Sequence, residues 1–145
     1  MYIYLLNKTL KTYIIDKDVV EEDALDQLIY GFELYCVDED GITKKNTFFI
    51  SHNDNRIIEY LEVGETKIKK LDLLKIAQIE FGNTRGNFCK MPISKLNSQS
   101  PKLCMTIILN FKSIDLIFSN AEELNQFCFG ICSLWKGEIE EDAKM

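Results

Sequence analysis

One long amphipathic helix near the end of the chain constrains the fold more than any other feature. From position 120 the apolar side chains recur on one helical stripe: Ala121, Leu124, Phe127, Cys128, Ile131, Leu134 and Trp135. Ser119 and Glu122 match a capping box at the start, and Gly137 suits the C-terminal cap. A helix with one apolar stripe must bury it against another element. We therefore expect this helix to cover a sheet, and Phe129, off the stripe, to be partly exposed.

The chain before this helix has the pattern of short strands. Apolar and β-branched runs are separated by turn-forming clusters such as Asp40-Gly41, and they occupy residues 30–37, 43–51, 56–63, 67–81 with a turn at 72–75, 103–111 and 113–118. Residues 82–101 contain several helix and strand breakers and are expected to form a long loop, with one short strand near 91–93. The predicted fold class is mainly β, with seven antiparallel strands and one C-terminal helix.

The length of 145 residues fits one domain. We place this domain at residues 23–137, after an N-terminal extension of residues 1–22 and before an acidic tail of residues 138–145 that we expect to be frayed. A short helix is expected at residues 19–29. The apolar residues 2–15 are expected either to add a strand or to cap one end of the sheet.

Three stretches, in this order, carry a family pattern: DALDQLIYGFELY at 23–35, DLLKIAQIEFGN at 72–83 and SIDLIFSNAEELNQF at 113–127. They resemble the lead-in helix and first strand, the fourth-to-fifth strand passage, and the final strand and helix start of pleckstrin homology (PH) domains, particularly those of phospholipase C. The resemblance places Phe127 where that family has its helix tryptophan. It implies a PH-like open barrel or sandwich capped by the helix, with Leu124, Phe127 and Ile131 as fold-defining residues.

The lipid-binding residues of the PH family are only partly matched. Phosphoinositide-binding members carry lysine near the end of the first strand and a Lys/Arg pattern at the start of the second, because multivalent phosphates need several charge-assisted donors. Here the intervening loop is Asp38-Glu39-Asp40, only Lys44 and Lys45 match, and Thr47 stands at the key arginine position. We expect the three carboxylates to repel a bisphosphate headgroup, so the usual phosphoinositide site is degraded.

Among PH-like proteins without the lipid signature, this Lys-, Ile- and Asn-rich chain is similar to the small inner membrane complex sub-compartment proteins of apicomplexan parasites. Those proteins are essentially one PH-like domain behind an acylated N-terminus, and they work through protein contacts. Tyr2 stands where an acylated member carries glycine. The resemblance implies a protein-binding scaffold or adaptor that is cytoplasmic and peripheral to a membrane, with a protein as its partner.

Charge supplies an alternative function. The formal net charge of −6 argues against a general nucleic-acid binder, which needs a basic surface. The charge is bipolar, however: residues 16–40 carry one basic and ten acidic side chains, whereas residues 41–102 carry eleven basic and six acidic ones. A basic patch there could bind anionic phospholipid headgroups, phosphoinositide or phosphatidic acid. The headgroup candidates are Lys44, Lys45, Arg56, Lys67, Lys69 and Lys70; the competing interpretation is a solvated strand face.

No pattern indicates catalysis. The sequence has no nucleophile elbow, P-loop or H-E-x-x-H motif, and His52 has no nucleophile at a recognisable spacing, so we expect no enzyme activity and no cofactor. The five cysteines form no C-x-x-C pair, which argues against a disulfide framework or a zinc site and for a reducing compartment. We expect Cys128 and Cys132 to be buried rather than to bind metal. No run approaches the roughly 18 apolar residues of a membrane span, so membrane contact should be peripheral.

Overall fold

The strands form one antiparallel sheet in the computed structural model, which describes residues 26–143, with side chains for 26–131 and 134. They are β1 (Phe32–Val37), β2 (Thr43–Ile50), β3 (Ile57–Glu62), β4 (Lys69–Asp72), β5 (Gln78–Phe81), β6 (Cys104–Ile108) and β7 (Ser113–Ile117). Their order in the sheet is β4-β3-β2-β1-β7-β6-β5. The predicted class is confirmed: seven antiparallel strands in an open sheet with a C-terminal helix, a PH-like architecture.

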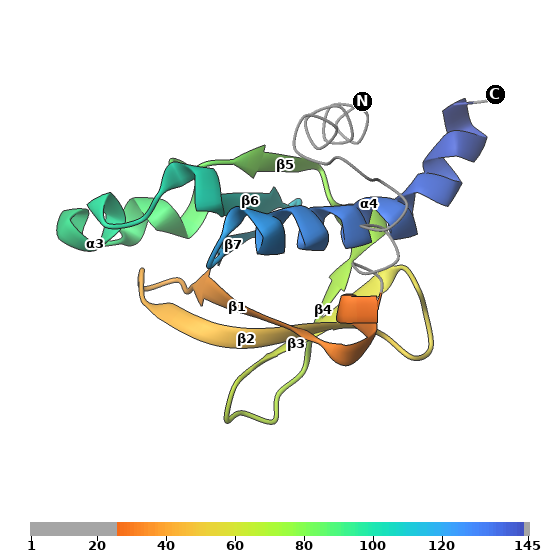
Figure 1. The fold of residues 1–145 in the computed structure, drawn as a ribbon, viewed down its shortest axis with the longest axis horizontal. Coiled ribbons are helices and arrows are strands. Elements are labelled where there is room, and N and C mark those ends of the chain that lie inside the picture. The colour runs from red at the N-terminus through yellow and green to blue at the C-terminus, as the bar shows by residue number, and fades with distance from the viewer. Residues whose placement is uncertain (1–25, 144–145) are drawn as a thin grey trace.

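Helix α4 (Ala121–Ala143) runs between the two halves of the sheet, with β1–β4 on one side and β5–β7 on the other (Figure 1). Two details of its predicted ends are wrong. Asn120 rather than Ser119 caps it, because the Asn120 side chain accepts the Glu123 amide at 2.8 Å while the Glu123 carboxylate accepts the Ser119 amide at 3.1 Å. The helix also continues through Gly137 to Ala143, so Gly137 is not its C-terminal cap.

The core lies between α4 and the inner side of the sheet. Leu124, Phe127 and Ile131 are all buried there, as predicted. The Phe127 ring meets the rings of Phe32, Phe48 and Phe118 at centroid distances of 5.6, 5.7 and 5.6 Å. Aromatic rings in edge or tilted contact gain more than their buried area alone. The expectation for Phe129 is wrong, because it is buried in the same core cluster, so the buried arc of α4 is wider than one stripe.

The segment predicted as a loop with a strand at 91–93 is helical instead. It contains η2 (Gly86–Lys90), α3 (Ile93–Asn97) and η3 (Pro101–Leu103). Phe88 and Met91 bury this segment against β1, β6 and β7 in a second core cluster. Short helical turns satisfy backbone groups locally, and the buried side chains then hold them on the sheet.

The N-terminal part of the chain is described only from residue 26. Residues 26–30 are helical, and Leu28 is buried in the main core, which agrees with the end of the helix predicted at 19–29. The start of that helix and the predictions for residues 2–15 lie outside the described residues.

Candidate functional site

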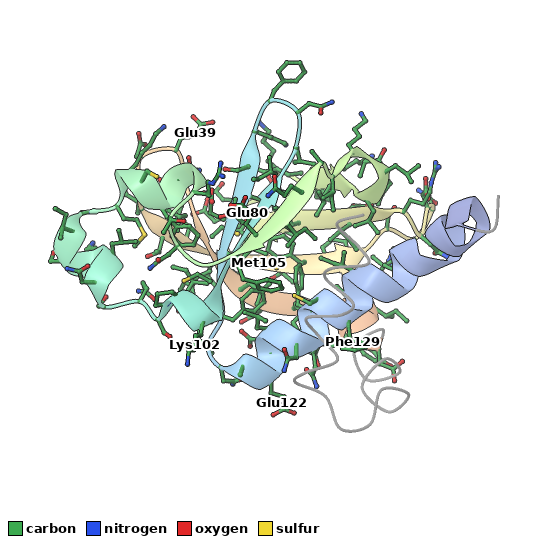
Figure 2. All side chains as sticks on the ribbon, turned by 90° about the horizontal axis from the view of Figure 1, so that it is seen from above. Glu39, Glu80, Lys102, Met105, Glu122 and Phe129 are labelled. Atoms are coloured by element: carbon green, nitrogen blue, oxygen red, sulfur yellow. The ribbon has the colours of Figure 1, made fainter. Side chains whose placement is uncertain are left out.

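A cavity of about 660 Å³ opens at the end of the barrel that α4 does not cover. Its lining comes from the β1–β2 turn, the inner sides of β2, β3 and β4, η2, and the β6–β7 hairpin, and includes no residue of α4. Glu39 in the β1–β2 turn and Glu122 in the first turn of α4 lie on opposite sides of the molecule (Figure 2). We call this space the mouth cavity.

The acidic β1–β2 turn forms one rim of the mouth cavity. Asp38 accepts the backbone amides of Asp40 and Ile42, both at 2.9 Å, and these bonds, led by that from Ile42, hold the pKa of its carboxyl below the ordinary 3.8. Gly41 has φ +78°, as the predicted tight turn requires. A Cβ at Gly41 would lie 2.3 Å from the Lys90 carbonyl oxygen, so the turn packs directly on η2.

The floor of the mouth cavity is polar and lies directly above the aromatic core. Strand alternation turns Asn46 and Phe48 to the same inner side of β2, and Tyr60 stacks on Phe48 with ring centroids 4.8 Å apart. Cys36 of β1 is the next wall residue. Burial raises the pKa of the Cys36 thiol and of the Tyr60 phenol to about 12, so neither is ionised near neutral pH. The floor can therefore donate and accept hydrogen bonds.

A buried carboxylate fixes the β6–β7 side of the cavity. Asp115 is 1% exposed. It accepts hydrogen bonds from the Thr106 hydroxyl at 2.8 Å, the Ser113 hydroxyl at 2.9 Å and the Asn87 backbone amide at 3.0 Å. The Asn87 side chain also donates to the Val37 carbonyl at 3.0 Å. Three donors satisfy a buried charge that would otherwise be costly. Asp115 therefore anchors η2 to the sheet.

Basic side chains in the mouth cavity fall into two groups. Lys44 is neutralised, with its Nζ 3.4 Å from Asp38 and 3.9 Å from Glu62. Lys69, Lys90 and Lys112 form no ion pair with any carboxylate of the described residues, and Lys69 Nζ lies 5.9 Å from the Tyr60 ring centroid. The cavity therefore carries charges of both signs rather than a concentrated positive field.

The headgroup candidates from the sequence do not gather on one surface. Lys44 and Lys69 line the mouth cavity, while Lys45 and Lys70 alternate to the outer face of the sheet. Lys45 pairs with Glu33 at 3.2 Å on that face, and its hydrogen bond with Glu33 raises the Lys45 pKa above 10.5. Two candidates lie in loops: Arg56, paired with Asp54 at 3.4 Å before β3, and Lys67, exposed between β3 and β4.

Sequence reasoning missed most of the mouth cavity. Asn46, Tyr60 and Asp115 were counted only as members of strands. A signal was present in the alternation, since Asn46 shares the inward phase with Phe48 and Asp115 interrupts an apolar strand. A polar residue in an inward phase needs an explanation. Lys90 and Lys112, by contrast, are brought to the cavity by tertiary structure alone.

Three other expectations from the sequence concern a metal site, the environment of Cys128, and a membrane-spanning helix. Among the described residues, no group of three or more His, Cys, Asp or Glu side chains is placed to hold a metal ion. Cys128 is buried, with its sulfur 3.5 Å from that of Met105. In the part of the chain that is described, no helix combines the length and apolar character needed to cross a bilayer.

Comparison with solved structures finds proteins of similar fold. Inner Membrane Complex Sub-compartment Protein 1 from Toxoplasma gondii superposes with a TM-score of 0.60 at 18% identity, covering 81% of this chain and 90% of that one. Sub-compartment Protein 3 from the same organism gives 0.60 at 13% identity, covering 86% and 88%. The fold is shared. No family model matches this chain, and no curated protein matches it.

Proposed function

We propose that this protein is a non-enzymatic, PH-like interaction module that acts as a protein-binding scaffold at a membrane-associated structure, cytoplasmic and peripheral to the membrane. The observation that carries this proposal is that carboxylates of this chain neutralise the two lysines at the start of β2, in the β1–β2 hairpin. Lys44 and Lys45 are the residues that the PH resemblance places at phosphate-binding positions, and each already pairs with carboxylates of this chain. A headgroup would have to displace those carboxylates, so the usual phosphoinositide site is degraded.

The fold relatives support the membrane-associated setting. Both named structures are proteins of an inner membrane complex, and they cover most of this chain. The outer face of β1–β3 supports a protein partner, because it mixes Tyr35, Val63 and partly buried Leu61 with the neutral Lys45–Glu33 pair. Aromatic residues, tyrosine among them, are enriched in protein interfaces.

Site-specific photo-crosslinking tests the scaffold function. A photoreactive phenylalanine analogue is placed at Tyr35 on the outer face or at Phe111 beside the mouth cavity, in the full chain expressed in its own cells, with Glu122 as the control position. We expect one or a few defined protein adducts from Tyr35 or Phe111, and no sedimentation of the purified chain with phosphoinositide vesicles. Tight vesicle binding without any specific adduct would overturn the proposal.

A second candidate function is binding to anionic phospholipid headgroups through a basic patch. The observation that favours it is that Lys67, in the loop before β4, and Lys70, on the outer face of β4, form no ion pair with carboxylates of the described residues. Each lysine near an anionic leaflet contributes about 1 kcal/mol, which salt screens. Sedimentation with phosphatidic acid or phosphoinositide vesicles at low and high salt tests it: binding lost at high salt supports the patch, and absence of binding at low salt rejects it.

A further inference from the structure

The floor of the mouth cavity contains polar groups that the described chain leaves without partners. Asn46 is 5% exposed, and its one hydrogen bond is donated by its amide nitrogen to the Lys44 carbonyl at 3.2 Å. The Asn46 amide oxygen and the Tyr60 hydroxyl form no hydrogen bond with the described residues, although Tyr60 is 6% exposed. Buried polar groups are usually satisfied, and leaving one unsatisfied is costly. An acceptor and a donor are therefore available at the bottom of an open cavity.

The size and charge of the mouth cavity define what could occupy it. About 660 Å³ is within the range of ligand pockets and exceeds the needs of a single ion. Lys69, Lys90 and Lys112 are available as cations, and Asp40 and Glu39 in the acidic turn beside Lys90 form no ion pair among the described residues. A polyanionic headgroup would be repelled by that turn. A polypeptide can present both signs, together with backbone groups for the floor.

The rim adds an apolar contact. Phe111 lies in the β6–β7 turn, lines the cavity and is fully exposed. Exposed large aromatic side chains next to a pocket are typical anchors of protein interfaces. The combination of an unpartnered polar floor, charges of both signs and an exposed ring is a set of groups that fits an extended peptide segment.

We propose that the mouth cavity binds an extended segment of a partner protein, in which an acidic side chain pairs with Lys69, the backbone bonds to Asn46 and Tyr60, and an apolar side chain packs on Phe111. This inference rests on the proposed scaffold function and names the chemistry of its partner. Asp115 is not part of the recognition set, since its carboxylate is already satisfied by Thr106, Ser113 and Asn87.

Selection from a random peptide library displayed on phage tests the inference, with the full chain as bait. Wild-type protein is expected to enrich sequences with Asp or Glu at one fixed position and an apolar residue at another. Lys69→Glu should shift the fixed position to Lys or Arg. Lys70→Glu is the matched control, because it makes the same charge change on the outer face of the same strand, and it should select the same peptides as wild type.

Two further measurements keep the test decisive if Lys69→Glu unfolds. Tyr60→Phe removes only the hydroxyl and keeps the ring on Phe48, so it should weaken the selected peptide at least about threefold, the equivalent of part of one hydrogen bond. Phe111→Ala should weaken it about tenfold.

Several results would overturn the inference. One is that the selected peptides have no fixed acidic position, and another is that wild type and Lys69→Glu select the same peptides. The third is that inositol phosphate or phosphatidic acid vesicles displace the bound peptide as effectively as an excess of the unlabelled peptide does. Defined photo-adducts from Tyr35 together with an unselective mouth cavity would leave the scaffold function standing while refuting this site.

Discussion

The two ends of the barrel are built from opposite chemistry. Where α4 packs, Phe127 meets three aromatic rings, and no charged side chain of the described residues is buried among them. At the mouth cavity most lining side chains are polar or charged, and the buried carboxylate of Asp115 is held by hydrogen bonds. The contrast indicates that the two ends have different roles. Apolar packing at the α4 end supplies most of the stability. Hydrogen bonds hold the shape of the mouth end, and its surface remains available for binding.

Phe127→Ala is expected to have the largest effect. Truncating this fully buried ring should lower the free energy of unfolding by about 3–5 kcal/mol, because it removes three ring contacts and leaves a cavity. Chemical denaturation measures the change. The control is Phe111→Ala, where the ring is fully exposed and the effect should stay within about 0.5 kcal/mol. Equal losses in the two variants would remove the distinction between the ends.

Gly41→Ala comes next and tests how firmly the acidic turn is seated on η2. Gly64→Ala is its matched control, because both glycines have positive φ, but an added Cβ meets the Lys90 backbone at Gly41 and nothing within 4 Å at Gly64. Both variants share the conformational cost of about 1–2 kcal/mol. We expect Gly41→Ala to lose about 1–3 kcal/mol more, since the turn must shift. Indistinguishable melting curves would show that the turn moves freely.

Asp115→Ala probes the hydrogen-bonded wall. The change leaves the Thr106 and Ser113 hydroxyls and the Asn87 amide without their acceptor, and we expect a loss of about 1–3 kcal/mol. Hydrogen exchange should show the Asn87 amide losing protection while amides of α4 around Phe127 keep theirs. Loss of protection at both places would mean that the two ends unfold as one unit.

Thiol chemistry gives the smallest and most local test. Burial raises the Cys36 pKa from 9.0 to about 12, so at pH 8 its thiolate fraction is roughly a thousandfold lower than in the unfolded chain. Iodoacetamide should therefore modify exposed Cys89 well before Cys36, and urea should abolish the difference. Because folding keeps the Cys36 proton, its contribution to stability is present below pH 9 and is lost as pH rises toward 12. Rapid modification of Cys36 at pH 8 would contradict the burial of its thiol in the wall of the mouth cavity.

The strands and α4 could be predicted because local patterns determine them. Hydrophobic periodicity predicts the strands and the burial of Phe127, and the Asp40-Gly41 pair predicts the turn. Residues 82–101 could not, since their breakers predict a loop, whereas η2 is held by long-range contacts such as the bond from Asn87 to Asp115 and the burial of Phe88. The pairing of Lys45 with Glu33 likewise depends on the β1–β2 register, which a net charge cannot reveal.

The narrow junction between β1 and β7 has a kinetic consequence. Only Tyr35↔Ile117 and Cys36↔Leu116 are in register there, whereas β1 and β2 align from Phe32↔Phe48 to Val37↔Thr43. The β1–β4 meander and the β6–β7 hairpin are local in sequence, but this junction joins the first strand to the last. Its loop-closure entropy is the largest in the sheet. Formation of the β1–β7 junction is therefore expected to limit the folding rate, and slowed refolding should be the signature of substitutions at Leu116 or Ile117.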